Sequence, residues 1–185
     1  MSLSAVVLGR REPRRARADV VCGIAAARLT LEVEFDFRVR AAAIAFEPLA
    51  TPAGFDELLA GIAEDTGAAA RQRDDDFGFR WVTLTGRSLD DLAISIGVVA
   101  ESLHVGGCWE HVMCAVFAFE PRVVGAEAPV YWIYNFARGG FHAFVPRGES
   151  NRDSAEELRL HESVSHDLRL EPDPQCWFPL WRIPV

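Results

Sequence analysis

The stretch that decides the fold is VYWIYNFARGGFHAFV, residues 130–145. Two runs rich in β-branched and aromatic residues, 130–136 and 141–145, flank Ala137-Arg138-Gly139-Gly140. Such residues favour strands, and a short loop with paired glycines is typical of a tight hairpin. Because a hairpin joins antiparallel neighbours, these residues predict an antiparallel sheet.

Outward from this hairpin, hydrophobic periodicity predicts the other elements. An i, i+3, i+4, i+7 apolar stripe from Phe55 to Ile62 indicates a helix that starts at Pro52 and ends at Gly67, and Ser88 caps the next helix. Apolar and polar residues alternate over 29–35, which indicates a strand with one solvated face. In chain order we expect a helix at 18–27, strands at 29–35 and 41–47, a helix at 52–67, a polar loop at 71–76, a strand at 77–84, a helix at 89–104, strands at 111–119, 130–136 and 141–145, and a helix at 153–168.

This order, α-β-β-α-β-α-β-β-β-α, contains hairpins and few βαβ units, which predicts an α+β fold. We expect an antiparallel sheet of about five to six strands with the helices packed mainly on one face. The 185 residues suffice for one domain, and half of them are apolar and a quarter charged, the ordinary globular balance. No apolar run is long enough for a membrane helix and no secretory leader is seen, so we expect a soluble, cytoplasmic protein.

Charge divides the chain into two unequal parts. Residues 1–17 set five arginines against Glu12, a net charge of +4, so residues 18–185 carry −12 of the overall −8. The five arginines are the candidate contacts of this basic arm: Arg10, Arg11, Arg14, Arg15 and Arg17. The acidic body, a single α+β domain at 18–185, argues against nucleic-acid binding. The arm, expected to be flexible, is either a solvated terminus or a contact for an acidic partner or for anionic lipid at the inner face of the membrane.

No recognisable catalytic machinery is present. The chain has no phosphate-binding glycine loop and no nucleophile elbow. Cys108, His111 and Cys114 lack the paired spacing of structural zinc sites, and an extended chain would turn His111 away from the two cysteines. Asp74-Asp75-Asp76 is either a divalent-cation site or a solvated loop that protects the next strand from aggregation. Consecutive carboxylates rarely converge on one point, so we predict no metal site here. Because the catalytic and phosphate-binding motifs are missing, we also predict no cofactor and no catalytic residue.

Aromatic residues are the most informative feature left. The terminal run Trp177-Phe178-Pro179-Leu180-Trp181 either folds back over the core or presents an interaction patch, with Trp177, Phe178 and Trp181 as candidate contacts. An alternative site is an apolar pocket with three aromatic walls and three polar groups. Its candidates are Phe77, Trp81, Trp132, Arg80, Arg138 and Asp153.

Several of these segments carry a family resemblance. They are Leu8-Gly9-Arg10, Phe77-Gly78-Phe79-Arg80-Trp81, residues 134–146, residues 152–158 and the run 177–181. In order and spacing the chain resembles the phage-shock-protein A associated protein PspAB family of actinobacteria and some archaea. The family start is usually a longer apolar stretch, whereas this chain has Ser2-Leu3-Ser4-Ala5-Val6-Val7, which weakens the case for a membrane-contacting helix there.

The resemblance implies an association with PspA, a coiled-coil protein that coats stressed membranes, and it carries over no catalytic residues. The leading hypothesis is a non-catalytic accessory protein of a PspA-linked envelope-stress response. The rivals are a small-molecule sensor or weak enzyme that uses the aromatic pocket, and a structural homodimer paired through a sheet edge or an apolar helix face.

Overall fold

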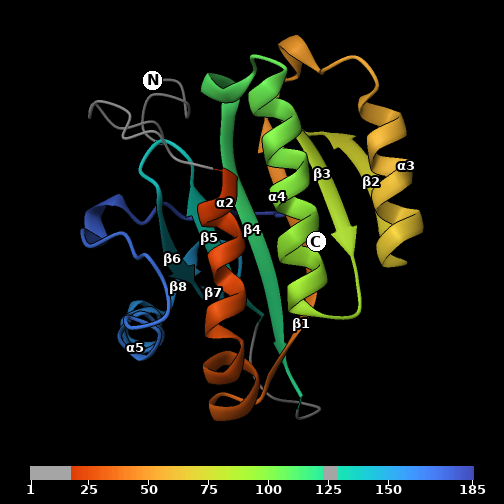
Figure 1. Ribbon diagram of the computed structural model, residues 1–185. Helices are drawn as coiled ribbons and strands as arrows, with labels where there is room; N and C mark the ends of the chain where they lie inside the picture. Colours follow the sequence, from red (N-terminus) through yellow and green to blue (C-terminus); the bar gives the residue numbers. More distant parts are fainter. Residues whose placement is uncertain (1–17, 123–128) are drawn as a thin grey trace.

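The computed structural model describes residues 18–122 and 129–185, and Figure 1 shows their course. Its centre is one six-stranded sheet in which all neighbours are antiparallel, with the order β2-β3-β1-β4-β5-β6. The strands are β1 (Phe37–Phe46), β2 (Ala69–Asp74), β3 (Arg80–Thr85), β4 (Val112–Pro121), β5 (Val130–Asn135) and β6 (Gly140–Phe144). A separate small hairpin pairs β7 (Pro146–Arg147) with β8 (Asn151–Arg152). The predicted α+β class is confirmed.

The helices of the described residues are α2 (Ala18–Val21), α3 (Phe55–Thr66), α4 (Leu89–Val105) and α5 (Ser154–Ser163). After α2 the chain stays helical through the 3₁₀ helix η1 (Cys22–Ala27) and the π-helical turn η2 (Thr30–Glu34). Residues 18–34 are therefore called the N-terminal helical segment. Short 3₁₀ turns complete the list: η3 (Pro48–Ala50), η4 (Trp109–His111) and η5 (Pro174–Cys176). Within 18–122 and 129–185, no helix is both long enough and apolar enough to cross a bilayer.

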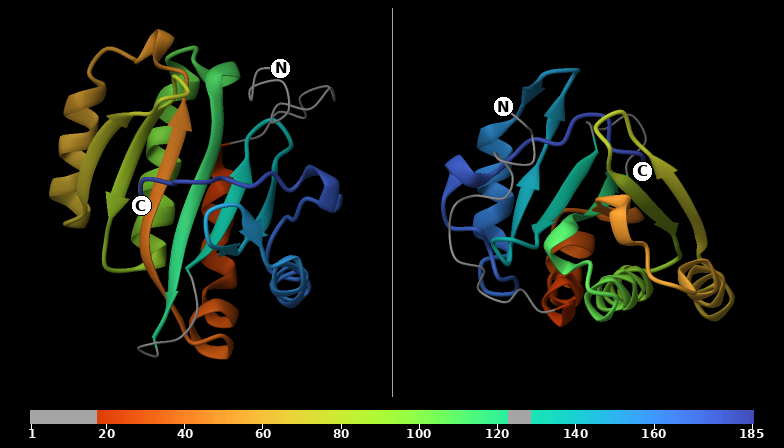
Figure 2. Two further views of the ribbon diagram at one scale, coloured as in Figure 1. Left: turned by 180° about the vertical axis from the view of Figure 1, so that it is seen from behind. Right: turned by 90° about the horizontal axis from the view of Figure 1, so that it is seen from above.

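The elements form three layers. The N-terminal helical segment and α4 run side by side over one face of the sheet, α3 lies next to α4, and α5 lies beside β6 (Figures 1 and 2). The last residues of the chain, 177–185, cross the opposite face of the sheet (Figure 2). We call these residues the strap. The prediction that helices pack mainly on one face is confirmed.

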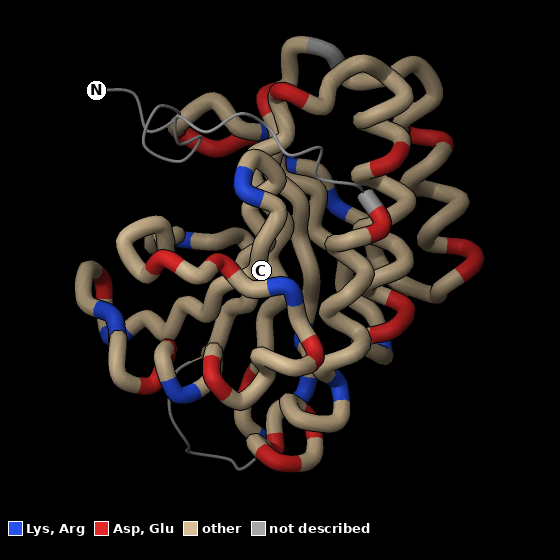
Figure 3. Tube along the Cα trace, turned by 60° about the vertical axis from the view of Figure 1, so that its left-hand side comes forward, with Lys and Arg blue, Asp and Glu red and all other residues tan. Residues whose placement is uncertain are grey.

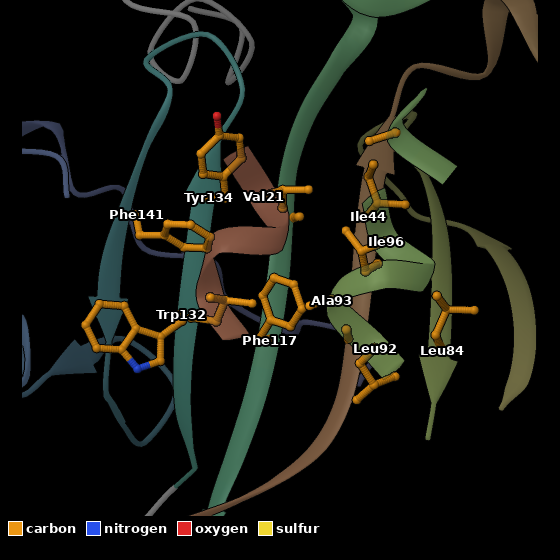
Figure 4. Packing of buried hydrophobic residues seen from close by; sticks show 14 of the residues in the cluster. Val21, Ile44, Leu84, Leu92, Ala93, Ile96, Phe117, Trp132, Tyr134 and Phe141 are labelled. Carbon is orange, nitrogen blue, oxygen red and sulfur yellow. The ribbon is translucent and has the colours of Figure 1, made fainter. Parts of the chain in front are cut away.

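Each face of the sheet carries its own apolar cluster. The helix-side core joins the strands to the N-terminal helical segment, α3 and α4, and Figure 4 shows Ile96, Phe117 and Trp132 within it. The strap-side cluster consists of Ala43, Ala45, Phe79, Trp81, Met113, Cys114, Val116, Ile133 and Phe144. Because both faces are covered, the central strand β4 is buried without interruption from Val112 to Phe119. A strand buried on both faces has a continuous apolar sequence rather than an alternating one.

The predicted β5–β6 hairpin is present. Asn135 pairs with Gly140, and the Asn135 Oδ1 accepts a hydrogen bond from the Ala137 N–H at 2.9 Å. Gly139 has a φ of 68°, in the left-handed region that favours glycine. A Cβ on Gly140 would lie 2.9 Å from the backbone nitrogen of Glu171. The two glycines therefore serve both the turn and a close approach of a second backbone segment.

The two edges of the sheet differ. Along β6, the Phe141 N–H donates to the Arg169 carbonyl at 2.9 Å, and the Glu171 N–H donates to the Phe141 carbonyl at 2.8 Å, so this edge is covered. The other edge strand, β2, exposes Arg71 and Arg73. Charged side chains on an open edge discourage pairing with another chain.

The strand predicted at 29–35 is wrong, because these residues form the end of the N-terminal helical segment. The Phe35 N–H donates to the Thr30 carbonyl at 3.2 Å, which closes the π-helical turn η2. The buried residues follow helical spacing: Val21, Ile24, Ala27 and Leu31. Of the apolar members of the alternating pattern, Leu31 is buried, whereas Leu29 and Val33 are exposed. The helical packing of residues 21–31 against the sheet decides the conformation here.

The loop predicted at 71–76 is also wrong in part, because residues 69–74 form β2. This strand pairs with β3 from Ala69↔Thr85 to Asp74↔Arg80. It is exposed along most of its length and therefore lacks an apolar alternation. The observed order is α-β-α-β-β-α-β-β-β-α, so one predicted strand is lost and another gained.

Several element boundaries move by a few residues. Helix α3 begins at Phe55 rather than at 52, β3 begins at Arg80 rather than at 77, and α5 ends at Ser163 rather than at 168. His111 lies in η4, not at the start of a strand. The predicted cap of α4 is confirmed, since the Ser88 Oγ accepts from the Asp91 N–H at 3.1 Å.

Candidate interaction surface

The predicted basic contacts cannot be placed, because they all lie outside the described residues: Arg10, Arg11, Arg14, Arg15 and Arg17. Their role stays a prediction. The other candidates fall within the described chain, and each has a definite place.

Trp177 anchors the start of the strap. It is 5% exposed, and its ring centre lies 4.6 Å from that of His161 on α5 and 6.4 Å from that of His142 on β6. Its Nε1 donates to the Glu171 carbonyl at 2.9 Å, and its own carbonyl accepts from Arg152 Nη1 at 2.7 Å. These contacts hold Trp177 inside the fold rather than at the surface.

The rest of the strap packs on the strap-side cluster. The apolar side chains that do so are partly buried: Phe178, Leu180, Trp181, Ile183 and Val185. Trp181 meets Phe144 edge to face at 5.1 Å. Two polar contacts fix the ends, from His142 Nε2 to the Phe178 carbonyl (3.1 Å) and from Thr83 Oγ1 to the Pro184 carbonyl (3.2 Å). The aromatic run therefore covers the sheet instead of standing clear of it.

The three aromatic pocket candidates do not come together. Trp132 is fully buried in the helix-side core, whereas Trp81 belongs to the strap-side cluster, so the sheet separates them. Phe77 lies in the turn between β2 and β3 and is 66% exposed.

Two of the polar pocket candidates have structural partners instead. Arg138 Nη2 donates to Glu171 Oε1 at 2.8 Å, which ties the β5–β6 turn to the segment that covers β6. Burial is the largest single effect on the pKa of Glu171 and raises it, but the hydrogen bonds from Arg138 and from the Asp173 N–H, together with the charge of Arg138, outweigh burial, so the net pKa is lowered. Asp153 caps α5 by accepting from the Glu156 N–H at 3.0 Å, and Arg147 Nη2 also donates to it at 3.0 Å. The Glu156 N–H and then Arg147 hold the pKa of Asp153 below its usual value.

The acidic cluster is used to build the β2–β3 turn. Arg80 is the third polar pocket candidate, and it too has a structural partner. Its Nε donates to Asp74 Oδ1 at 2.7 Å, and this hydrogen bond lowers the pKa of Asp74. Asp75 accepts from the Phe79 N–H at 2.9 Å and from Trp81 Nε1 at 2.8 Å. In the part of the chain that the structure describes, no three His, Cys, Asp or Glu side chains are placed to share a metal ion.

Three buried polar atoms have no hydrogen-bond partner among residues 18–122 and 129–185: Trp132 Nε1, Tyr134 Oη and His142 Nδ1. Burial lowers the pKa of His142 to about 4 and raises that of Tyr134 to about 12. Trp132 and Tyr134 belong to the helix-side core, whereas His142 contacts the strap on the other face. The three atoms therefore do not outline one site.

Exposed apolar side chains gather on the helical layer. Eight large apolar residues are exposed in the described part of the chain, and five of them lie on the N-terminal helical segment and α4: Leu29, Val33, Ile94, Val98 and Val105. Contiguous apolar surface on a folded protein is typical of an interaction site. We call the outward side of these two helices the helix-pair face.

Close packing brings the two helices of this face together. Cys22 Sγ lies 3.4 Å from the Ala93 carbonyl oxygen, and Arg28 Nε lies 3.3 Å from Asp90 Oδ2. Ala93, whose carbonyl makes the contact with Cys22, and Gly97, one turn further along α4, are small and buried. The exposed apolar residues therefore lie on two helices that are direct neighbours in the helical layer.

The helical layer is also strongly acidic. The N-terminal helical segment, α3 and α4 contain ten acidic residues and one basic residue, Arg28, a net charge of −9. The acidic residues are Asp19, Glu32, Glu34, Asp56, Glu57, Glu64, Asp65, Asp90, Asp91 and Glu101. Figure 3 marks acidic positions in red and basic positions in blue. Most of the −12 charge of residues 18–185 thus lies on this one layer.

The helix-pair face was not among the candidates predicted from the sequence. Ile94 and Val98 lie within the helix predicted at 89–104, and Val105 follows it directly at the same helical spacing. The apolar stripe at Leu92, Ile96, Val99 and Leu103, however, already supplies the buried side that such a helix requires. A second apolar stripe on the same helix was the available signal.

Comparison with known proteins adds the family. No curated protein and no solved structure matches the chain. The family model described as PspA associated protein B matches residues 1–185, the whole chain. The chain therefore belongs to the PspA associated protein B (PspAB) family.

Proposed function

We propose that this chain is a non-catalytic accessory protein that binds PspA, and that the helix-pair face is its contact surface. The family description supports the partner, since it names association with PspA. The observation that carries the site is the concentration of exposed apolar side chains on two adjacent helices. Burial of apolar surface is the dominant favourable contribution in most protein–protein association.

The strap is a weaker candidate for the contact. Its aromatic side chains already cover the sheet, and Trp177 is buried under α5. To reach a partner they would first have to leave the strap-side cluster, which exposes apolar surface on the sheet. The helix-pair face needs no such rearrangement.

The experiment is a calorimetric titration of a purified PspA-type protein into the full chain. The test variant combines Ile94→Glu with Val98→Glu, and the control is Leu158→Glu on α5. The control is matched because Val98 is 40% exposed and Leu158 45%. We expect the double variant to bind at least about tenfold more weakly, because each introduced charge must be desolvated at the contact, and the control to match the wild type.

Two results would contradict the proposal. One is an absence of binding by the wild-type chain at concentrations up to tens of micromolar. The other is equal weakening by the double variant and by Leu158→Glu. A further variant, in which the five arginines of residues 1–17 become glutamine, measures what the basic arm adds to the same affinity.

The biological role follows from the partner. An accessory protein that binds PspA would act in the envelope-stress response to which PspA belongs. The basic arm would supply a peripheral contact with anionic lipid, each arginine near the surface contributing about 1 kcal/mol. Sedimentation with vesicles that contain anionic lipid, with and without the arginine-to-glutamine changes, tests this second contact.

A further inference from the structure

Helix α4 carries a second regular stripe on its outward side. Ile94, Val98, Glu101 and Val105 are all exposed, and their spacing is 4-3-4. This is the spacing of the a and d positions of a heptad repeat, which align along one helix when it pairs with another. The stripe extends over about 17 Å, or roughly three helical turns.

The stripe is not needed for the fold. The opposite side of α4 supplies Leu92, Ile96, Val99 and Leu103 to the helix-side core, where all four are fully buried. The neighbouring helix α3 shows what an ordinary outward side is like, because it exposes Asp56, Glu57, Glu64 and Asp65. The outward side of α4 therefore differs from that of α3 in the same layer, because it is apolar rather than acidic.

Glu101 interrupts the stripe with a charge. Its side chain is exposed and makes no hydrogen bond or ion pair with another residue of 18–122 or 129–185. A polar residue at a heptad position specifies the register and the partner, because it destabilises any helix that places an apolar group opposite it. Glu101 therefore requires a hydrogen-bond donor, and best a cation, from whatever helix pairs with α4.

We propose that α4 is a coiled-coil docking helix: its outward stripe takes one α-helix of the partner, with apolar residues at heptad spacing and a lysine or arginine opposite Glu101. The proposal deepens the proposed function and rests on it, since it assumes that the helix-pair face meets a partner. A second copy of this chain fits poorly, because it would bring two helical layers of charge −9 together.

The test uses two synthetic helical peptides of roughly four heptads with the same leucine and isoleucine seam. One has lysine at the central seam position and the other has glutamate. Binding of each labelled peptide to the full chain is followed by fluorescence anisotropy. The chain variants are Glu101→Lys and, as the matched control on α3, Glu64→Lys.

We expect the lysine peptide to bind the wild-type chain at least about tenfold more tightly than the glutamate peptide, since a close charge pair replaces a like-charge contact. The preference should reverse in Glu101→Lys and persist in Glu64→Lys. Equal binding of the two peptides, binding of neither, or a preference that survives Glu101→Lys would overturn the proposal.

The two proposals fail in different ways. Binding of the lysine peptide without any binding of PspA defeats the proposed partner and leaves the docking helix in place. Binding of PspA that is unchanged in Glu101→Lys supports the partner and overturns the assignment to α4.

Discussion

His142 shows how single residues hold the strap to the sheet. The side chain is fully buried on β6, and its Nε2 lies 3.1 Å from the Phe178 carbonyl. Burial is the main reason that its pKa falls to about 4, and the positive charge of Arg152 also disfavours protonation. The hydrogen bond to the Phe178 carbonyl and the charge of Glu171 raise the pKa of His142. The charge of His161 lowers it, as that of Arg152 does. The neutral ring is therefore the form that keeps the strap in place.

This pKa predicts a loss of stability in mild acid. In the unfolded chain His142 titrates near 6.5, and in the folded chain at about 4, so the unfolded state binds more protons between these values. The free energy of unfolding should be highest above pH 6.5 and should fall as the pH drops toward 4, by on the order of 3 kcal/mol from this residue. Urea unfolding over this range, compared with His142→Gln, measures it. Parallel pH profiles for the two proteins would exclude the assignment.

Asp75 illustrates an acidic residue whose role is structural. Its Oδ1 accepts from the Phe77 and Phe79 N–H groups, each at 2.9 Å, and its Oδ2 accepts from Trp81 Nε1 at 2.8 Å. We expect Asp75→Ala to lower the free energy of unfolding by about 2 kcal/mol, because it leaves these donors without their acceptor. Asp76→Ala is the control, as Asp76 is an exposed neighbour and its change should stay within about 0.5 kcal/mol. Equal effects of both variants in chemical denaturation would show that Asp75 does not organise the turn.

At the scale of elements, the strap and α4 differ in whether their apolar side chains are covered. The strap is apolar and covered by its contacts with the sheet, whereas α4 keeps an apolar stripe in solvent after its inner side is buried. Without the strap, the strap-side cluster would leave much of one face of the sheet exposed. The strap therefore completes the fold, whereas the outward apolar side chains of α4 stay exposed.

The strap can be tested through Trp181. Trp181→Ala removes the ring that meets Phe144 at 5.1 Å, and because Trp181 is only partly buried we expect a loss of about 2 kcal/mol in the free energy of unfolding. Binding of a hydrophobic dye should rise as the sheet face opens. Phe77→Ala is the control, an exposed aromatic in a turn that should change neither property. A neutral result for Trp181→Ala would show that the strap adds little to the fold.

The sequence predicted the elements with a strong local signal and failed where tertiary contacts decide. The β5–β6 hairpin and α4 were predictable because paired glycines and a capping serine act within a few residues. The N-terminal helical segment was misread at 29–35, since an apolar alternation there coincided with a helical stripe that only packing against the sheet reveals. Strand β2 was missed because an exposed edge strand is defined by its partner, β3, and not by its own pattern.

The same limit applies to the candidate site. Trp81 and Trp132 were grouped by residue type, but the sheet places them on opposite faces, which no local pattern indicates. The helix-pair face combines residues from 29 to 105 in the chain, and its exposure depends on how two distant helices pack. In each case the chemical character of the residues was predictable from the sequence, but which of them lie together in the fold was not.

At the scale of the whole molecule, the three layers differ in the kind of surface that they leave exposed. The sheet and the strap bury their aromatic residues, while the helical layer combines exposed apolar side chains with a net charge of −9. Such a surface favours a partner helix with an apolar seam and basic flanks. Residues 1–17 carry a net charge of +4, opposite in sign to the helical layer, and their contact with an acidic partner or anionic lipid stays a prediction. Membership of the PspA associated protein B family makes PspA the partner to test first.

The most direct test is hydrogen–deuterium exchange of the full chain with and without a saturating PspA-type protein. We predict slower exchange in residues 89–105 and 18–34 and unchanged exchange in β2, α5 and the strap, because the partner helix would lie only on the helix-pair face. Protection confined to the strap or to β2, with α4 unchanged, would contradict it.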